Sequence, residues 1–315
     1  MQCRGHEAGL FVLWVPQNRR HLRSSRVVYS KMPPTHLISV VVTTYNRSDA
    51  LRQVLRGLAQ QNDKGFELII ADDGSSQTHR DSIQTAASTF GRQLTHVWHP
   101  DIGFTASRVR NRGVSVAQGD YIVFLDGDCI PEIDFVRQHR RLMEQGCFVN
   151  GSRVLLSEIF TREIVSTNVS VSGCSPSYWI KKRWTGDASK LTGLLRLPDF
   201  AFRKQPGFVW RGIRSCNMGV WRADFEAING FDESFVGWGH EDADFVLRLH
   251  NFGLKRKNGF CATEVYHLWH PESSRAQESK NADQVKERQQ THQVLSAEGY
   301  RQSLGGADMV VNRLG

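Results

Sequence analysis

Two aspartates, Asp126 and Asp128, directly follow a short apolar run at residues 121–125 and are separated by one glycine. The run is rich in β-branched and aromatic residues, which predicts a buried strand. Carboxylates at the end of such a strand need something to bind, because burying an unpaired charge is costly. Gly127 allows a close approach of the backbone to a ligand. The pair therefore predicts a divalent cation on nucleotide phosphates, with an ordinary Asp-Gly turn as the alternative.

Polar residues also follow two earlier apolar runs. The first run, residues 37–43, leads into Thr44-Tyr45-Asn46, and the second, residues 66–71, ends at Asp72-Asp73-Gly74-Ser75. Strands that alternate with helices form a parallel sheet covered on both faces. Ligands of such sheets bind beyond the carboxyl ends of the strands. We therefore expect the polar residues of all three strand ends to converge on one site.

The elements that position this site follow from apolar periodicity and from capping residues. Strands are expected at residues 37–43, 66–71, 94–99 and 121–125. Helices are expected from Ser48, around residues 78–88 and 105–118, from Pro131, and over residues 243–250. A polar, helix-prone segment runs from about residue 281 to 298. Residues 150–210 have no regular pattern, so they receive no assignment.

Composition excludes several classes of protein. Of 315 residues, 40% are hydrophobic and 23% charged, which is ordinary for a globular protein. Six scattered cysteines without a CxxC pair argue against a zinc ribbon or a disulfide framework. Residues 1–31 carry six Lys/Arg and one Glu, so only +3 of the net charge of +8 belongs to the remaining chain. A nucleic-acid partner is therefore not expected.

The basic leader has two interpretations. Residues 1–34 form either a disordered arm that touches anionic lipid or a mis-assigned start, with Met32 as the true first residue, and we favour the second. No apolar stretch has the length of a transmembrane helix, and no signal peptide is evident. We therefore expect a cytoplasmic protein, with peripheral contact to the inner membrane as an option.

The ordered motifs resemble those of inverting family 2 glycosyltransferases. VVTTYNR (residues 41–47), ADDGS (71–75), RNRG (110–113) and LDGD (125–128) occur in the order typical of that family. INGFDESFVGWGHEDADF (228–245) is similar to the acceptor-side segment of β-1,4-galactosyltransferases and chondroitin-type polymerases. The resemblance covers roughly residues 37–270. It implies the GT-A fold, a Rossmann-like α/β fold whose mostly parallel sheet is flanked by helices, in a single catalytic domain.

The resemblance also implies how a UDP-sugar donor is held. Thr43 and Tyr45 offer groups to the uracil edge, and Asp73 accepts a hydrogen bond from the uracil N–H, whereas Asp72 supports the turn. Arg110 lies near the phosphates, with a solvated helix face as the rival interpretation. Asp126 touches the ribose or the metal.

The metal and the acceptor are assigned in the same way. Asp128 is the direct ligand of Mn²⁺ or Mg²⁺, and His267 is a further ligand, with His270 a weaker candidate. Asp242 matches the family's catalytic base, and Glu241 binds acceptor hydroxyls. Trp238 offers a flat face to a sugar ring, and Asn217 lines the floor of the site. The alternative for the acids is that they only cap the following helix.

Together these residues predict a metal-dependent inverting glycosyltransferase. It would move one sugar from a UDP-sugar to a hydroxyl of a glycan or lipid-linked glycan, in bacterial surface polysaccharide synthesis. Residues 35–150 are the expected nucleotide-sugar half, residues 151–275 the acceptor and catalytic half, and residues 276–315 a C-terminal helical tail. Processive polymerases carry two such domains, so addition of a single sugar is expected. The alternative function is an inactive sugar-nucleotide-binding scaffold.

Overall fold

Four parallel strands form the centre of a nine-stranded sheet in the computed structural model, which describes residues 36–167, 169–271 and 278–315. The predicted leader lies outside these residues. The spatial order of the strands is β12 (Val310–Leu314), β3 (Leu94–Trp98), β2 (Phe66–Asp72), β1 (Ile38–Thr44), β4 (Tyr121–Asp126), β9 (Asn217–Trp221), β6 (Cys147–Asn150), β10 (Lys255–Asn258) and β8 (Lys204–Gln205).

The direction of pairing changes at β9. β1, β2, β3 and β4 run parallel, whereas β9 is antiparallel to both β4 and β6. β12 joins the other side of the sheet, antiparallel to β3. The expected α/β fold with a mostly parallel sheet is confirmed. Strands from both predicted halves share this sheet, since β6 and β10 pair in parallel.

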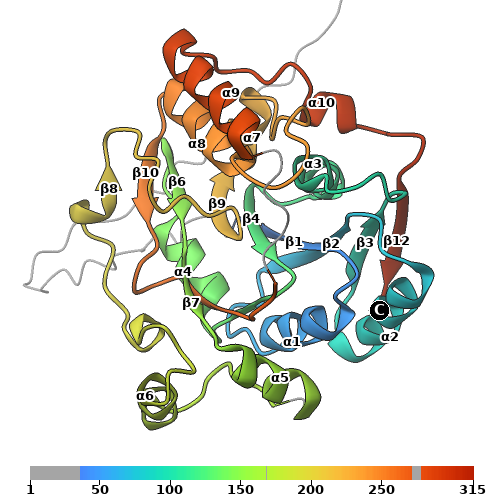
Figure 1. Cartoon of the computed structure of the whole chain (residues 1–315), viewed down its shortest axis with the longest axis vertical. Coiled ribbons are helices and arrows are strands. Elements are labelled where there is room, and N and C mark those ends of the chain that lie inside the picture. The colour runs from blue at the N-terminus through green and yellow to red at the C-terminus, as the bar shows by residue number, and fades with distance from the viewer. Residues whose placement is uncertain (1–35, 168, 272–277) are drawn as a thin grey trace, which may run out of the picture. The chain divides into compact units, whose positions relative to one another are not determined.

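Helices cover both faces, as Figure 1 shows. The residues of β1 alternate between the faces, because successive side chains of a strand point in opposite directions. Val40 and Val42 pack with α1 and α2, and Val41 packs with α3 and α8. The helices are α1 (Ser48–Ala59), α2 (Gln77–Phe90), α3 (Ala106–Val116), α4 (Phe135–Leu142), α5 (Glu158–Thr167), α6 (Pro176–Trp184), α7 (Arg222–Ala227), α8 (Glu241–Asn251), α9 (Glu278–Thr291) and α10 (Tyr300–Ser303), with short 3-10 turns at Thr192–Leu194 and Ala201–Arg203.

A second, three-stranded sheet was not predicted. It consists of β5 (Cys129–Pro131), β11 (Glu264–His267) and β7 (Ser152–Leu155), with β11 in the centre. The expectation of a helix start at Pro131 was wrong: Pro131 pairs with Val265, and α4 begins only at Phe135. Proline fits an edge strand because it has no N–H to donate. This sheet places the residues after β4 beside those of β11.

The C-terminal segment is only partly helical. α9 and α10 are followed by β12, whose sequence VVNRL is rich in the β-branched residues that favour a strand. The expectation of a wholly helical tail therefore has to be corrected. None of the helices in the described ranges is long and apolar enough to span a bilayer.

Candidate active site

Arg110 joins the two predicted halves of the site. Its guanidinium lies 3.2 Å from Oε1 of Glu241 and 3.3 Å from Oδ1 of Asp126. The side chain is buried on α3, and its charge lies over the ring of Phe231. The neighbouring carboxylates raise the pKa of Arg110 despite its burial. The sequence interpretation of Arg110 as a site residue rather than a solvated one agrees with this position.

The turn after β4 is held tightly against β1. The hydroxyl of Thr43 donates to Oδ1 of Asp126 at 2.9 Å, and the N–H of Gly127 donates to the carbonyl of Thr43 at 2.7 Å. A Cβ on residue 127 would lie 2.7 Å from that carbonyl oxygen, which no side chain tolerates. Glycine is thus required between the two aspartates by the close approach of the β1 backbone, and not by the approach of a ligand that the sequence suggested.

Asp128 faces two histidines. Its carboxylate oxygens lie 3.7 Å from Nε2 of His267 and 3.4 Å from Nε2 of His270. The pairing of β5 with β11 sets this geometry, because it places Cys129 opposite His267. The backbone N–H of Leu268 also donates to the carbonyl of Asp128 at 2.9 Å. His270, the weaker candidate from sequence, also lies near Asp128, but only His267 belongs to the group of described residues whose ligand atoms cluster around Asp128.

These side chains fit a divalent cation. Atoms of Asp128, Cys129 and His267 that can bind a metal lie within 4.8 Å of one another. Burial lowers the pKa of His267, which favours the neutral imidazole that a metal requires. Burial raises the pKa of the Cys129 thiol. Carboxylate and imidazole donors suit Mn²⁺ better than a thiol does.

The acidic pair Glu241-Asp242 opens α8, and the loop before it is unusual. Gly237, Gly239 and His240 all have positive φ, at 79°, 109° and 70°. The loop contacts the segment that precedes α3, since the N–H of Gly237 donates to the carbonyl of Phe104. His240 is the N-cap residue, and its ring lies 5.3 Å from that of Trp210. The conformation of this loop therefore sets the orientation of the first turn of α8, which carries Glu241 and Asp242.

The two acids have different partners. Glu241 pairs with Arg110 at 3.2 Å, whereas no ion pair or side-chain hydrogen bond joins Asp242 to another residue in the described part of the chain. Burial raises the pKa of Asp242, and burial together with the charge of Asp242 raises the pKa of Glu241. A carboxylate with a raised pKa is a stronger base. Arg110 donates a hydrogen bond to Glu241 but not to Asp242. An acceptor hydroxyl can therefore reach Asp242 without displacing Arg110.

A network of buried ion pairs connects α8 to α9. Arg288 of α9 donates to Asp244 at 2.5 Å and to Asp232 at 2.7 Å. Arg248 donates to the other oxygen of Asp244 at 2.8 Å. Asn281 of α9 holds the carbonyl of Gly239 in the loop. Sequence reasoning missed Arg288, because it lies in a polar helix without a motif.

Replacing Arg288 by methionine is expected to destabilise the protein by about 3–5 kcal/mol, because it leaves the buried Asp232 without its cation and Asp244 with Arg248 alone. The measurement is the free energy of unfolding in urea. Lys286→Met is the matched control on the same helix, since Lys286 pairs with Asp283 in solvent and should contribute less than about 1 kcal/mol. Equal losses in the two variants would show that the buried network does not stabilise α8.

The residues proposed for the uracil edge lie at the ends of β1 and β2. Asp73 is buried and accepts from the N–H and hydroxyl of Thr105, and one of its oxygens lies 3.0 Å from Nε2 of His99. Asp72 accepts from the N–H of Ser75 at 2.8 Å, so it supports the turn as expected. Tyr45 is exposed and donates to Asp101. Asp73 thus already has three protein contacts.

Asn217 does not line a floor that an acceptor could reach. It is fully buried in β9, its amide nitrogen donates to the carbonyls of Ser152 and Thr263, and its oxygen lies 3.0 Å from Nε2 of His139. Its expected role in acceptor binding therefore has to be withdrawn on steric grounds. Trp238, by contrast, is 37% exposed in the loop before α8, as an acceptor platform requires.

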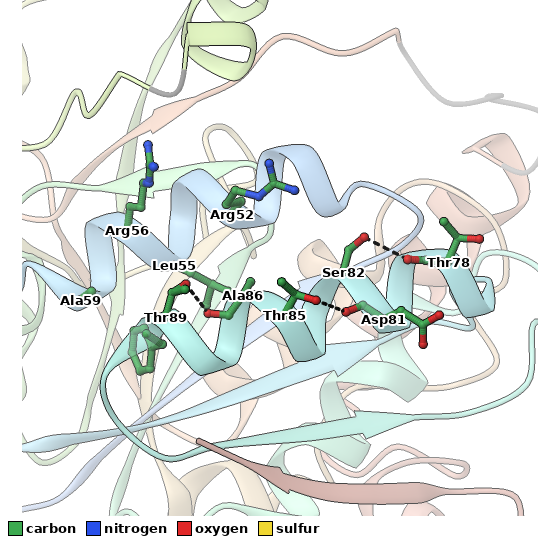
Figure 2. A pocket seen from close by; sticks show the side chains of 11 residues that line it. Arg52, Leu55, Arg56, Ala59, Thr78, Asp81, Ser82, Thr85, Ala86 and Thr89 are labelled. Atoms are coloured by element: carbon green, nitrogen blue, oxygen red, sulfur yellow. Dashed lines mark hydrogen bonds between the residues drawn. The ribbon is translucent and has the colours of Figure 1, made fainter.

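A groove of about 760 Å³ lies elsewhere, between α1 and α2 (Figure 2). Its lining contains none of the predicted donor, acceptor or metal residues. The hydroxyls of Ser82, Thr85 and Thr89 point back to carbonyls of their own helix, as the dashed lines in Figure 2 show. These groups have little left to offer a ligand, so the groove is not the candidate site.

Comparison with known families agrees with this geometry. Residues 39–195 match the model for glycosyl transferase family 2, and residues 200–271 match the N-terminal domain of galactosyltransferase. The chain belongs to glycosyl transferase family 2. The boundary between the two matches falls after α6 and before the segment that carries Glu241 and Asp242. The family 2 match and the galactosyltransferase match therefore cover consecutive parts of the chain.

Curated relatives align with about two thirds of this chain. A validoxylamine A glucosyltransferase of Streptomyces hygroscopicus is 27% identical over 69% of this chain and 52% of its own length. A chondroitin synthase of Escherichia coli is 27% identical over 69% of this chain and 32% of its own length. The family 2 chain thus spans about half or less of the length of these relatives.

The fold is also found among solved structures. The crystal structure of S. aureus TarS residues 1–349 superposes with a TM-score of 0.52 over 84% of this chain and 68% of that chain, at 13% sequence identity. A second structure of S. aureus TarS gives a TM-score of 0.53 over 84% of this chain and 41% of that chain. This likeness confirms the expected GT-A fold.

Proposed function

We propose that this chain is a metal-dependent inverting glycosyltransferase that moves one sugar from a UDP-sugar to a hydroxyl of a glycan or lipid-linked glycan. The observation that carries the proposal is the position of Arg110 between Asp126 and Glu241. The buried guanidinium of Arg110 connects Asp126, which lies two residues before the metal candidate Asp128, with Glu241 at the start of α8. The donor and acceptor groups thus belong to one site.

The chemistry follows from these positions. A divalent cation held by Asp128, His267 and His270 would neutralise the charge that grows on the departing UDP. Asp242 takes the proton of the acceptor hydroxyl as the oxygen attacks the anomeric carbon. Glu241 orients the acceptor, and Arg110 keeps Glu241 ionised and in place. Trp238 stacks on the acceptor sugar. A single displacement, in which the deprotonated acceptor oxygen attacks the anomeric carbon from the side opposite the departing UDP, would invert the configuration at that carbon.

The relatives support a glycan or glycoside acceptor. One is named as a glucosyltransferase and another as a chondroitin synthase. We propose that the product is part of a bacterial surface polysaccharide and that transfer takes place on the cytoplasmic side of the membrane. The donor sugar stays open, since epimers differ by a single hydroxyl contact.

A thermal-shift screen tests the donor and the metal together. Because a ligand that binds only the folded state raises its stability, UDP-sugars with Mn²⁺ should raise the melting temperature, by the equivalent of about 2.7 kcal/mol at a hundredfold excess over Kd. UDP-sugars with EDTA, and GDP-mannose with Mn²⁺, should raise it much less. Stabilisation by GDP-mannose alone would reject the UDP assignment. Stabilisation without UDP release in the presence of acceptors would instead favour a binding scaffold.

A further inference from the structure

Large apolar side chains are exposed where α5 and α6 pack together, at one end of the molecule in Figure 1. Trp184 is 88% exposed, Ile159 79% and Ile180 51%. In α6, Ile180, Lys181 and Trp184 fall on one face at helical spacing. Together with Arg183 we call these five residues the α5–α6 face. Exposed apolar groups gathered on one surface mark an interaction site.

Two basic side chains of this region have no acidic partner among the described residues. Lys182 lies 3.2 Å from both Glu163 and Asp187, and Arg162 pairs with Glu158. The acids of α5 and of the turn after α6 are therefore neutralised by neighbours. Lys181 and Arg183 are exposed, and neither makes an ion pair with any part of the chain that the structure describes. The α5–α6 face is thus apolar and positive.

The face is rigidly connected to the metal candidates. Trp179, on the buried side of α6, stacks on Tyr266 with ring centroids 3.9 Å apart and an interplanar angle of 7°. Tyr266 precedes His267 in β11, and its hydroxyl bonds to Glu132. α5 joins the same packing, since the ring of Phe160 lies against Trp179 and below Nζ of Lys182. Anything that binds the α5–α6 face is therefore held in a fixed orientation to Asp128 and the histidines.

We propose that the α5–α6 face docks on a bilayer that contains anionic phospholipid. Tryptophan prefers the headgroup region, isoleucine the acyl boundary, and lysine and arginine the anionic surface, and the face presents these three kinds of residue together. A protein partner would have to supply both acids for Lys181 and Arg183 and a pocket for Trp184. A lipid surface supplies both without a specific shape. Docking there would hold the enzyme beside an acceptor that is anchored in lipid.

Binding of the full chain to vesicles tests this proposal, and the measurement does not depend on transfer activity. The probes are vesicles of phosphatidylglycerol and phosphatidylcholine in equal amounts, with pure phosphatidylcholine for comparison, in a sedimentation assay. The double variant Lys181→Ala/Trp184→Ala should reduce binding to the anionic vesicles at least about tenfold. Phe252→Ala/Lys255→Ala is the matched control, because it also removes an exposed aromatic and a lysine three residues apart.

The control should bind vesicles within about twofold of the wild type. All variants keep the basic residues 1–31, so a difference between them reports the α5–α6 face alone. Equal binding of the wild type and Lys181→Ala/Trp184→Ala would overturn the proposal. It would also be overturned if the wild type self-associates without lipid and this double variant does not, since a second copy would then be the partner. Trp184→Phe should retain binding and lose quenching by brominated lipid.

Discussion

Replacing Asp242 by asparagine is expected to reduce sugar transfer by at least about a hundredfold, the usual scale of a lost general base. Asparagine keeps the size of the side chain and its place at the start of α8, but it cannot take a proton from the acceptor hydroxyl. Affinity for UDP should change little, because Asp242 lies on the acceptor side of Arg110. The measurements are kcat for transfer and Kd for UDP with Mn²⁺.

Glu241→Gln separates the two acids. It removes the negative charge that lies 3.2 Å from the Arg110 guanidinium and should mainly raise KM for the acceptor, while part of kcat survives. If Glu241→Gln loses as much kcat as Asp242→Asn and Asp242→Asn keeps near-normal turnover, Glu241 is the base and the assignment has to be exchanged.

The acid limb of the pH profile reports the same group. Asp242 must be ionised to act as a base, and burial raises its pKa above the usual value of about 3.9. Activity is therefore lost as the pH falls through a pKa higher than that of an ordinary aspartate. kcat/KM measured against pH should show this limb in the wild type. A limb at the ordinary value would mean that the carboxylate is solvated in the working enzyme.

Asp128→Ala should abolish the metal-dependent part of UDP binding. The carboxylate lies within 3.7 Å of both His267 and His270, so its removal takes away the charged oxygen ligand nearest to the two imidazoles. Asp128 is partly exposed, and the fold should therefore survive the change. The melting temperature with UDP and Mn²⁺ should fall to the value measured with EDTA, which thermal unfolding checks directly.

Cys129→Ala is the control for this metal assignment. Cys129 is the neighbour of Asp128, but its buried thiol has a raised pKa and is not expected to bind the cation. The variant should keep the difference in melting temperature between Mn²⁺ and EDTA, whatever its own stability. The opposite result is an Asp128→Ala variant that binds UDP with wild-type affinity, and equally well with EDTA and with Mn²⁺. That result would refute the role of the aspartate pair.

The sequence predicted those parts of the site that depend on local pattern. The strand before Asp126 and the acids at the start of α8 lie where apolar runs and helix signals placed them. The three-stranded sheet was missed, because its strands are only three or four residues long and its pairing is set by contacts far apart in sequence. For the same reason, the position of His270 beside Asp128 could not be derived from spacing.

Burial was the other quantity that local pattern could not supply. Asn217 belongs to a motif-rich segment, yet its amide is bonded entirely within the protein. Arg288 belongs to a segment that reads as a solvated helix, yet it is 7% exposed and pairs with two acids of the acceptor half. In both cases a distant element decides whether a polar side chain meets solvent, a ligand or the protein core.

The two borders of the nine-stranded sheet differ in what they present to another chain. A parallel strand such as β3 would present a row of unpaired N–H and C=O groups if it formed the border of the sheet, and another chain could pair with it. β12 covers β3 over five residue pairs, from Leu94 to Trp98. The opposite border, β8, is only two residues long and offers little to pair with. β12 thus keeps another molecule from pairing with β3, and β12 itself, five exposed or half-buried residues long, is the border strand on that side of the sheet.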